Sequence, residues 1–456
     1  MPKRREFIKH SLLGTAGMAI GGMTLDAKSY RSIVGANERV NVAVIGIRGQ
    51  GTAHIHNWCD IKQSHNVRLK TLCDTDEQYF AEKSKIVVDK TGETPSTEWD
   101  LRKVFDDKEI DAVSFAVPNH WHALGTIWAC QAGKHVYVEK PASHNIFEGR
   151  KMIEAARKYK RRVQVGFQNR SILSVMEAID FLHKGGIGEV YMARGLCIKP
   201  RDSFGITKDS EPPATLHYDQ WLGPAARRPY NEKKGHYNWH WFWETGNGDT
   251  GNQGPHQFDI ARWGLNKNEH PQFVYSNGNI YDIDPKECAQ ETPNTQTSVL
   301  KYADGKIIEF ETRGRYSNAE AGLGISIGNI FYGSGGWLEI DGETWRAFRQ
   351  REKEPFAGSK KEEDRQKELT SHVASNGAPH WINFLEAIRA EDDKKLHCDI
   401  HEGYLSSCLP HLSNISYRLG RQLKFDGQKE KFVNDAEADA LTTRKYRAPF
   451  VVPEKV

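Results

Sequence analysis

An apolar, β-branched run that leads straight into a glycine-rich turn is the feature that most restricts how this 456-residue chain can fold. Residues 40–45 have the composition of a strand buried on both faces, and the glycine-rich turn spans 46–51. A helical pattern begins at residue 52. This order of strand, tight turn and helix predicts the first unit of a parallel, doubly wound sheet.

The alternation of strands and helices continues to about residue 168. We expect further strands at 67–72, 112–117, 136–138 and 163–165, with helices at 52–59, 78–88, 121–132 and 147–159. A helix at 173–183 then precedes longer strand-like runs at 189–198, 273–280, 297–302, 306–312 and 337–340, and helices at 381–390 and 403–419. Residues 303–305 have the composition of a hairpin turn. The sequence therefore predicts an α/β protein, with a doubly wound Rossmann domain followed by an α+β domain whose open sheet is largely antiparallel.

The domain boundaries are placed where the pattern changes. We expect an export signal and linker at 1–35, the Rossmann domain at 38–168, a substrate-binding α+β domain at 169–430, and a C-terminal extension at 431–456 that packs back on the body. The first residues resemble a twin-arginine export signal, with Arg4 and Arg5, then Phe7, then a Gly- and Ala-rich apolar stretch at 11–22. A basic, partly helical tail is the alternative. The stretch is too short and glycine-rich for a membrane span, so we expect export to the periplasm without membrane insertion.

Composition narrows the classes of partner. A formal net charge of +3, from 63 basic and 60 acidic residues, gives no electrostatic reason to expect nucleic acid or a membrane surface. The seven cysteines are scattered and form no CxxC pair. This argues against a disulfide framework and a cysteine-based zinc site, and we expect them to be small buried side chains.

The glycine turn has the spacing of a phosphate-binding loop, except that Arg48 stands where the middle glycine of GxGxxG is expected. Gly46 allows the tight turn, Gly51 allows close packing of helix and strand, and Gly49 permits approach of a pyrophosphate. Asp74 ends the second expected strand, where a carboxylate accepts hydrogen bonds from both ribose hydroxyls. It would repel a 2′-phosphate, so NAD is favoured over NADP. A helix N-cap is the structural alternative for this acid.

Polar residues also follow two later strands of the expected sheet. Pro118 and Asn119 follow the strand at 112–117, and Asn119 is placed to bond a ribose or the nicotinamide amide. The nearby His-x-His pair lacks a third ligand, so we expect no metal. Lys140 follows the strand at 136–138, and ligands of open parallel sheets gather at the carboxyl ends of strands. A solvated surface lysine is the alternative.

The second domain contains a glycine- and asparagine-rich stretch that precedes an apolar helix. Asn252 and His256 lie four residues apart and share a face of that helix. Histidine is the side chain best suited to proton transfer near neutral pH, although a structural histidine is the alternative. Upstream, the aromatic run at 236–243 suits stacking on a sugar or, equally, a packed core.

Taken together, the glycine turn, Asp74, Pro118-Asn119-x-x-His122, Glu139-Lys140-Pro141 and the second-domain histidine helix resemble the Gfo/Idh/MocA oxidoreductases. The resemblance implies a nicotinamide cofactor, oxidation of a sugar or polyol hydroxyl, and an open sheet that forms a homo-oligomer contact. The family pattern is Lys followed by Asp-x-x-x-His. Lys140 and His256 match it, whereas Asn252 occupies the Asp position and cannot stabilise an imidazolium by charge; Asp249 is the nearby acid.

These observations lead to one assignment of site residues. Lys140, His256 and Asn252 are assigned to catalysis, and Tyr237, Trp239, His240 and Asp249 to the substrate. The cofactor site is assigned Gly46, Arg48, Gly49, Gly51, Asp74, Pro118, Asn119, His122, Glu139, Lys140 and Gln168. We expect a dehydrogenase with tightly held NAD that acts on a sugar, polyol or glycoside. The alternatives are a redox-neutral glycosidase and a non-catalytic sugar- or nucleotide-binding protein.

Overall fold

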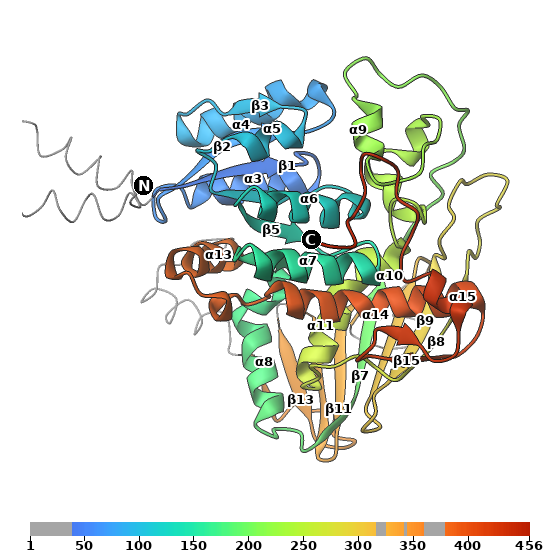
Figure 1. Ribbon diagram of the computed structural model, residues 1–456. Coiled ribbons are helices and arrows are strands. Elements are labelled where there is room, and N and C mark those ends of the chain that lie inside the picture. The colour runs from blue at the N-terminus through green and yellow to red at the C-terminus, as the bar shows by residue number, and fades with distance from the viewer. Residues whose placement is uncertain (1–38, 316–324, 342–343, 360–378) are drawn as a thin grey trace, which may run out of the picture. The chain divides into compact units, whose positions relative to one another are not determined.

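Six parallel strands form the sheet of the N-terminal half, in the order β3-β2-β1-β4-β5-β6 (Figure 1). The strands are β1 (Val40–Ile45), β2 (Val67–Cys73), β3 (Ser96–Glu98), β4 (Ala112–Phe115), β5 (His135–Glu139) and β6 (Val163–Gly166). The computed structural model describes residues 39–315, 325–341, 344–359 and 379–456, so the predicted export signal and linker lie outside the described residues. The strand order reverses between β1 and β4, so the topological switch point of the sheet lies between their carboxyl ends.

Helices cover both faces of this sheet, as a doubly wound fold requires. They are α3 (Gln50–Asp60), α4 (Phe80–Thr91), α5 (Leu101–Asp106), α6 (Asn119–Gln131) and α7 (Ile146–Lys158). Helix α13 (Pro379–Ala390), although distant in sequence, packs on the same face as α3. There Trp381 stacks on Tyr137 of β5 with ring centroids 5.0 Å apart, and Phe384 lies against Trp58 of α3.

The second sheet has ten strands in the order β14-β13-β12-β11-β7-β10-β9-β8-β15-β16. Their bounds are β7 (Val190–Ile198), β8 (Phe273–Asn279), β9 (Thr295–Lys301), β10 (Ile307–Arg313), β11 (Ile327–Gly333), β12 (Gly336–Ile340), β13 (Trp345–Phe348), β14 (Ala357–Gly358), β15 (Leu423–Asp426) and β16 (Lys431–Phe432). Only β7 and β10 run parallel among the pairs of these described strands, and β9 pairs with β10 around the expected hairpin. The largely antiparallel second sheet is therefore confirmed.

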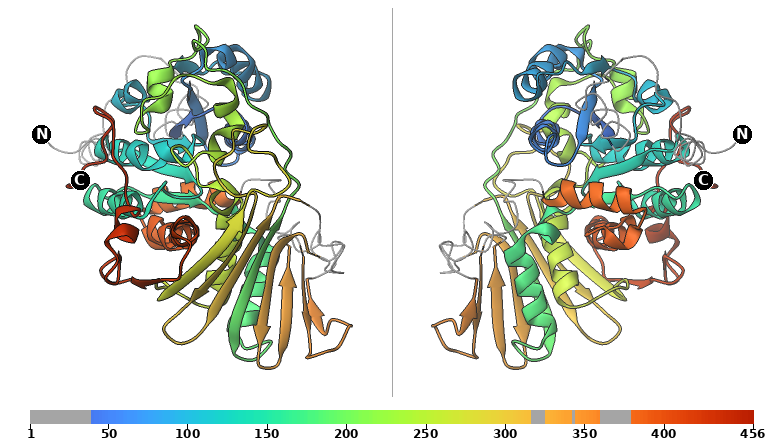
Figure 2. Two further views of the ribbon diagram at one scale, coloured as in Figure 1. Left: turned by 90° about the vertical axis from the view of Figure 1, so that its right-hand side faces the viewer. Right: turned by 90° about the vertical axis from the view of Figure 1, so that its left-hand side faces the viewer.

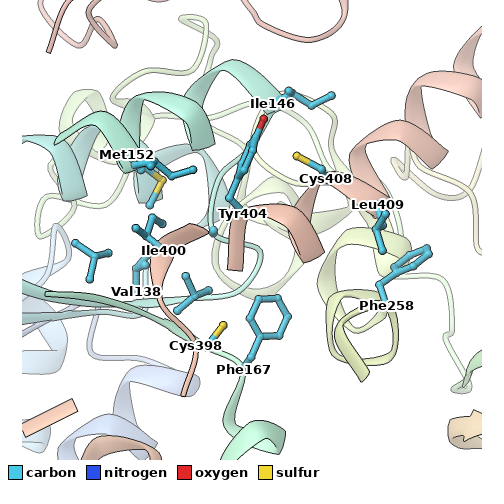
Figure 3. Packing of buried hydrophobic residues seen from close by; sticks show 14 of the residues in the cluster. Val138, Ile146, Met152, Phe167, Phe258, Cys398, Ile400, Tyr404, Cys408 and Leu409 are labelled. Carbon is cyan, nitrogen blue, oxygen red and sulfur yellow. The ribbon is translucent and has the colours of Figure 1, made fainter. Parts of the chain in front are cut away.

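One continuous core joins the two sheets. The helices α8 (Leu173–His183), α11 (Gly254–Gly264) and α14 (Ile400–Leu419) lie on one face of the second sheet (Figure 2). Tyr404 and Leu409 of α14 belong to the same apolar cluster as Val138 of β5, Met152 of α7 and Phe258 of α11 (Figure 3). All seven cysteines are buried and free, as their scattered positions predicted.

Between β7 and α10 (Gly248–Asn252) the chain leaves the second sheet and passes along the carboxyl ends of the first, where α9 (Tyr218–Leu222) lies (Figure 1). An antiparallel bridge joins Asp76 to Leu216 in this crossing segment. Near the end of the chain, after α15 (Ala436–Ala440), Phe450 packs edge-on against Trp121 of α6. Within the described ranges, no helix has the length and apolar character needed to cross a membrane.

Candidate active site

The glycine turn after β1 forms an open cradle at the N-terminus of α3. Gly46 has φ 82°, and a Cβ added there would lie 2.6 Å from the main-chain oxygen of Ala116. A Cβ on Gly51 would lie 1.8 Å from the oxygen of Gly46, so both glycines are required by close packing. Gly49 has φ 44° and nothing within 4 Å of the position of a Cβ. The open space at Gly49 and the N-terminus of α3 suit a pyrophosphate.

Asp74 and Arg48 lie on the rim of this cradle. The Asp74 carboxylate accepts hydrogen bonds from the main-chain N–H groups of Ile47 at 2.9 Å and Asp76 at 3.0 Å. Burial raises the pKa of Asp74 from its ordinary value. The N-cap of the following helical turn is Asp76, so the capping alternative does not apply to Asp74. Arg48 packs over the ring of Tyr79 at 4.3 Å.

Two buried polar atoms in this region have no hydrogen-bond partner among the described residues: Nη1 of Arg48 and Oδ1 of Asn119. Asn119 is 1% exposed and begins α6 directly after Pro118. A buried polar group without a partner is costly unless a ligand satisfies it. The polar groups of a dinucleotide would satisfy both atoms, so the residues present fit this cofactor.

Glu139, at the end of β5, is the centre of a buried hydrogen-bond cluster. Its Oε1 accepts from Nε2 of Gln168 at 2.7 Å, of His54 at 3.0 Å and of Gln50 at 3.3 Å. Nδ1 of His54 faces Oγ of Ser114 at 2.9 Å, so the ring links β4 to Glu139 of β5. Burial raises the pKa of Glu139, but the hydrogen bond and charge of His54 outweigh it and bring that pKa to about 2. Glu139 is thus a fixed carboxylate beside Lys140.

Sequence reasoning missed three members of this cluster: Gln50, His54 and Ser114. They come from α3 and β4 and reach Glu139 only because β1, β4 and β5 are neighbours in the sheet. The available signal was a histidine on the buried face of α3, which periodicity alone does not distinguish from a structural histidine.

Lys140, Asn252 and His256 come together at the carboxyl end of β5. Nζ of Lys140 donates to the main-chain oxygen of Asn252 at 2.9 Å. Burial lowers the pKa of His256 to about 4, and the charge of Lys140 also lowers it. Nδ1 of His256 is buried and has no partner among the described residues. A neutral imidazole with a free nitrogen is able to accept a proton near pH 7.

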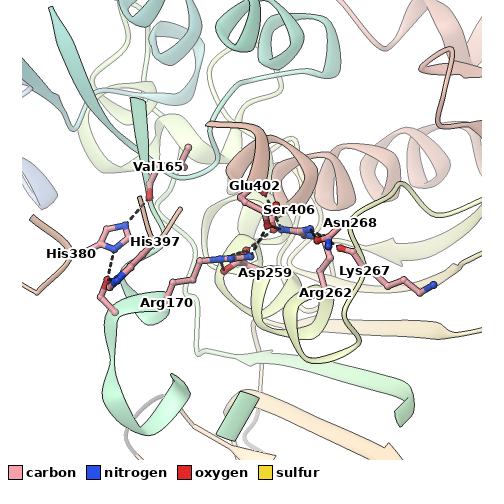
Figure 4. A network of polar contacts seen from close by, with 11 residues as sticks. Val165, Arg170, Asp259, Arg262, Lys267, Asn268, His380, His397, Glu402 and Ser406 are labelled. Carbon is pink, nitrogen blue, oxygen red and sulfur yellow. Dashed lines mark hydrogen bonds and ion pairs between the residues drawn. The ribbon is translucent and has the colours of Figure 1, made fainter. Parts of the chain in front are cut away.

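Helix α11, which carries His256, is anchored by a buried ion pair at Asp259 (Figure 4). The Asp259 carboxylate accepts from Nε of Arg170 at 2.8 Å and from Oγ of Ser406 at 2.6 Å. Nε of Arg262 donates to the same Ser406 hydroxyl at 2.9 Å. Burial raises the pKa of Asp259, but the charge of Arg170 outweighs it and lowers that pKa below its ordinary value. This network ties the second and third turns of α11 to α14.

His122 is buried between the loops that follow β4 and β5. Its Nδ1 lies 2.7 Å from the oxygen of Pro141, and its Nε2 lies 2.9 Å from the oxygen of Val117. The ring therefore ties the loop after β4 to the loop after β5. This geometry suits a role in holding the two loops in place. Asn119 differs, because its Oδ1 has no partner among the described residues.

The residues assigned to the substrate surround Arg201, which sequence reasoning missed. Nε and Nη2 of Arg201 each lie 2.8 Å from a different carboxylate oxygen of Asp249. Nη1 of Arg201 donates to the hydroxyl of Tyr237 at 3.0 Å, and Nδ1 of His240 lies 2.6 Å from the main-chain oxygen of Tyr237. Trp239 is half-buried, and its ring centroid lies 5.8 Å from that of His240. Both Asp249 oxygens therefore pair with Arg201, and no hydrogen bond joins Asp249 to His256 in the described residues.

No group of three or more His, Cys, Asp or Glu side chains in the described residues has an arrangement that could hold a metal ion. In the His-x-His pair, at which no metal was expected, the two ring nitrogens of His120 face the main-chain oxygens of Trp221 and Thr245 at 3.0 and 3.3 Å. His122 is likewise occupied by main-chain oxygens.

Two family models match most of the sequence. The model of the Gfo/Idh/MocA oxidoreductase family described as an NAD-binding Rossmann fold matches residues 40–167. The model described as the C-terminal alpha/beta domain of the oxidoreductase family matches residues 205–333 and 363–452.

Individual proteins are similar to this chain at sequence identities below 30%. An alpha-N-acetylgalactosaminidase from Shewanella oneidensis is 27% identical over 170 residues, which are 34% of this chain and 36% of that protein. The chain thus spans less than half the length of the curated relatives it matches. Levoglucosan dehydrogenase, solved with NADH and levoglucosan, has a TM-score of 0.64 and 17% identity over 85% of this chain and 99% of that one. Aldose-aldose oxidoreductase from Caulobacter crescentus has a TM-score of 0.59 and 18% identity over 85% and 100%. These two structures share the fold.

Proposed function

The chain belongs to the Gfo/Idh/MocA oxidoreductase family, and from this premise we propose that it oxidises a hydroxyl group of a sugar, polyol or glycoside with NAD. The observation that carries the proposal is the meeting of Lys140 and a neutral His256 at the carboxyl end of β5. This end lies beside the point where the strand order reverses, and open α/β sheets bind their ligands there. The sugar-bound and NADH-bound structures with the same fold are in keeping with the proposal.

Each residue has a distinct role in the proposed reaction. The turn at Gly46, Gly49 and Gly51 would hold the pyrophosphate, and Asp74 the adenosine ribose. The nicotinamide, when bound, supplies the acceptor for the hydride that leaves the carbinol carbon.

The catalytic residues act on the substrate hydroxyl. His256 accepts the hydroxyl proton, because its depressed pKa keeps the imidazole neutral and one nitrogen has no partner among the described residues. The Lys140 ammonium stabilises the oxygen as negative charge develops on it. Glu139 stays ionised and keeps the loop that carries Lys140 in place through its bonds to His54 and Gln168.

The geometry at Asp74 supports NAD over NADP. Its carboxylate is held by two main-chain N–H groups at the rim of the cradle, where a 2′-phosphate would meet a negative charge. Each carboxylate oxygen has acceptor capacity left for a ribose hydroxyl.

The crossing segment between β7 and α10 supports a tightly held cofactor. The main-chain N–H of Glu77 donates to Thr215 at 3.0 Å, and that of His217 donates to Thr75 at 2.8 Å. The His217 ring also stacks on Trp99 with centroids 3.9 Å apart. These contacts fasten the segment immediately beside Asp74, which supports slow exchange of a bound dinucleotide.

A redox-neutral glycosidase is the second candidate. The observation in its favour is the similarity to an alpha-N-acetylgalactosaminidase and to further proteins of glycosyl hydrolase family 109. In that reaction the hydride removed from the substrate is returned within the same cycle, which a retained cofactor permits.

One experiment tests both candidates. The purified protein is denatured and any released dinucleotide is identified; the native protein is then supplied with sugars and glycosides. A keto-sugar with stoichiometric NADH supports the dehydrogenase, whereas free sugar from a glycoside without NADH supports the glycosidase. A protein that binds dinucleotide and sugar but turns over neither kind of substrate would be the non-catalytic binding protein.

We also propose that the protein is exported by the twin-arginine pathway and that it associates with further copies of itself. The Arg4-Arg5 pair and the stretch at 11–22 support twin-arginine export, which carries proteins already folded around a cofactor. Lysine at both arginine positions would keep the protein in the cytoplasm on cell fractionation. The face of the second sheet opposite α8 and α11 supports a homo-oligomer, which light scattering at several protein concentrations tests.

A further inference from the structure

Lys199 directly follows β7 and carries a positive charge that the proposed reaction does not use. Its main-chain N–H donates to Arg313 at 3.1 Å, so the pairing of β7 with β10 continues to this residue. Alternate side chains of a strand point to the same face. Gly195 lies on the face covered by α11, because a Cβ there would lie 3.0 Å from Cβ of Gln257. Because side chains alternate, Cys197 and Lys199 lie on the same face as Gly195.

Arg201, two residues further along, lies close to α10 beyond the end of β7. Its guanidinium reaches the Asp249 carboxylate on α10 at 2.8 Å. The same short helix ends at Asn252, whose main-chain oxygen binds the Lys140 ammonium. Lys199 therefore lies on the side of the sheet that faces the proposed reaction centre. Its charge acts on Lys140, whose pKa is lowered first by burial and then by Lys199, with Glu139 and Asp249 acting in the opposite direction.

The positive charge of Lys199 is not balanced in the part of the chain that the structure describes. There its ammonium has no ion pair and no hydrogen bond, and the side chain is half-buried. Arg201 is different, because Asp249 neutralises it in a two-point contact. Glu139 is also engaged, by Gln50, His54 and Gln168. Glu139 balances one of the two ammonium charges and Arg201 balances Asp249, so these residues together keep one positive charge, which favours an anionic ligand.

We propose that the substrate is a sugar with one negatively charged group, a carboxylate or a sulfate ester, which pairs with Nζ of Lys199. The inference rests on the proposed function and names its substrate class. Lys140 serves the reacting hydroxyl, so one ammonium is left for one anionic group. A lysine suits a monoanion as a point charge, whereas the forked donor set of Arg201 is already used by Asp249.

The first test compares matched sugars as reductants of the protein-bound cofactor: a hexose, its uronate, and its 6-O-sulfate. The charged sugar is expected to have a kcat/KM about tenfold or more above that of the hexose, since a charge-assisted hydrogen bond adds about that factor. The better of the two charged sugars identifies the group. Lys199→Gln should remove most of this preference through KM, and Lys199→Arg should retain it. Lys301→Gln is the control, because it removes the same charge from an exposed position on β9.

A binding measurement separates this inference from the proposed function. If no sugar reduces the cofactor, the proposed function fails, but calorimetric titration with the uronate and the sulfate ester still tests Lys199. Binding of either anion that weakens about tenfold in Lys199→Gln and not in Lys301→Gln supports the site. Equal affinity for neutral and charged sugars, binding of neither, or an unchanged affinity in Lys199→Gln would overturn it.

Discussion

Lys140 binds Asn252 through the main chain: its Nζ donates to the peptide oxygen at 2.9 Å. The contact is therefore indifferent to which side chain occupies position 252. An acid or an amide at this position leaves Lys140 in place and changes only the surroundings of His256, which lies four residues further along a nearly continuous helical stretch. Asn252 in place of the family's Asp is therefore expected to affect His256 and not the position of Lys140.

Asn252→Asp should shift the pH dependence of the reaction. A carboxylate on the same helical face favours the imidazolium, so the pKa of His256 should rise from about 4. A base must be deprotonated to act, so the acid limb of the kcat/KM profile should move up by about one pH unit. Asn266→Asp adds the same charge at an exposed position beyond α11 and should leave the profile unchanged. Identical profiles for both variants would exclude His256 as the base.

Lys140→Met should abolish most of the chemistry and leave the cofactor bound. Loss of one preorganised donor to a developing oxyanion typically lowers the rate by about 10²–10³-fold. Single-turnover reduction of the bound nicotinamide measures this step without interference from product release. Lys301→Met is the matched control on an exposed strand position. Full single-turnover rates in Lys140→Met would contradict the assignment.

Gly166→Ala should disturb the Glu139 cluster from the neighbouring strand. A Cβ at this position would lie 2.8 Å from Oε1 and 2.9 Å from Cδ of Glu139. The carboxylate would have to shift away from His54 and Gln168, at an expected cost of about 1–3 kcal/mol in the free energy of unfolding. Urea denaturation measures that cost, and dinucleotide content after purification reports the site. Gly235→Ala meets only one atom within 4 Å, at 3.8 Å, and should behave as the unmodified protein.

Buried neutral histidines should make the protein sensitive to mild acid. Burial lowers the pKa of His120 to about 3 and those of His256 and His411 to about 4. The unfolded chain binds these protons near pH 6.5, whereas the folded chain does not, so stability is full above about pH 6.5 and is lost as pH falls towards 4. Each histidine contributes up to about 1.4 kcal/mol per pH unit in that window.

His411→Gln provides the check on this linkage. Nε2 of His411 lies 3.0 Å from the oxygen of Ser143, and a glutamine amide is able to keep a donor there. The slope of Tm against pH between pH 7 and 5 should become shallower. The change should correspond to the uptake of about one proton fewer on unfolding. His56→Gln replaces a histidine that is not fully buried and serves as the comparison. An equal slope in His411→Gln and the unmodified protein would show that this ring is protonated when folded.

The strands that sequence patterns predicted and those they missed differ in how they are stabilised. β1, β2, β4, β5 and β6 carry apolar β-branched residues, and the structure confirms them. The sequence patterns missed β3, β11, β13, β14, β15 and β16. β3 has the sequence Ser-Thr-Glu and the last four have two to four residues each, so their strand character comes from pairing with a neighbour. β11 has seven residues, but glycine and asparagine interrupt its apolar pattern. α13 was expected as a helix, but its packing on the first sheet beside Tyr137 had no local signal.

By itself, the sequence determined the class of the two sheets, five of the six strands of the first, and the polar residues at the carboxyl edge of the first. A buried strand needs a continuous apolar run, and parallel strands bring the residues after them to one edge. That is why Asp74, Asn119 and Lys140 could be placed at this edge from their positions in the sequence alone.

Only the tertiary structure decided which partners these residues have. His54 reaches Glu139 across 85 positions, and Arg201 reaches Asp249 across 48. Such pairs form where separate elements pack against each other, and no periodicity within either element records the distance between them. The pairing of Arg201 with Asp249, and the absence of a partner for Lys199 in the described residues, are the features that define the charge of the site.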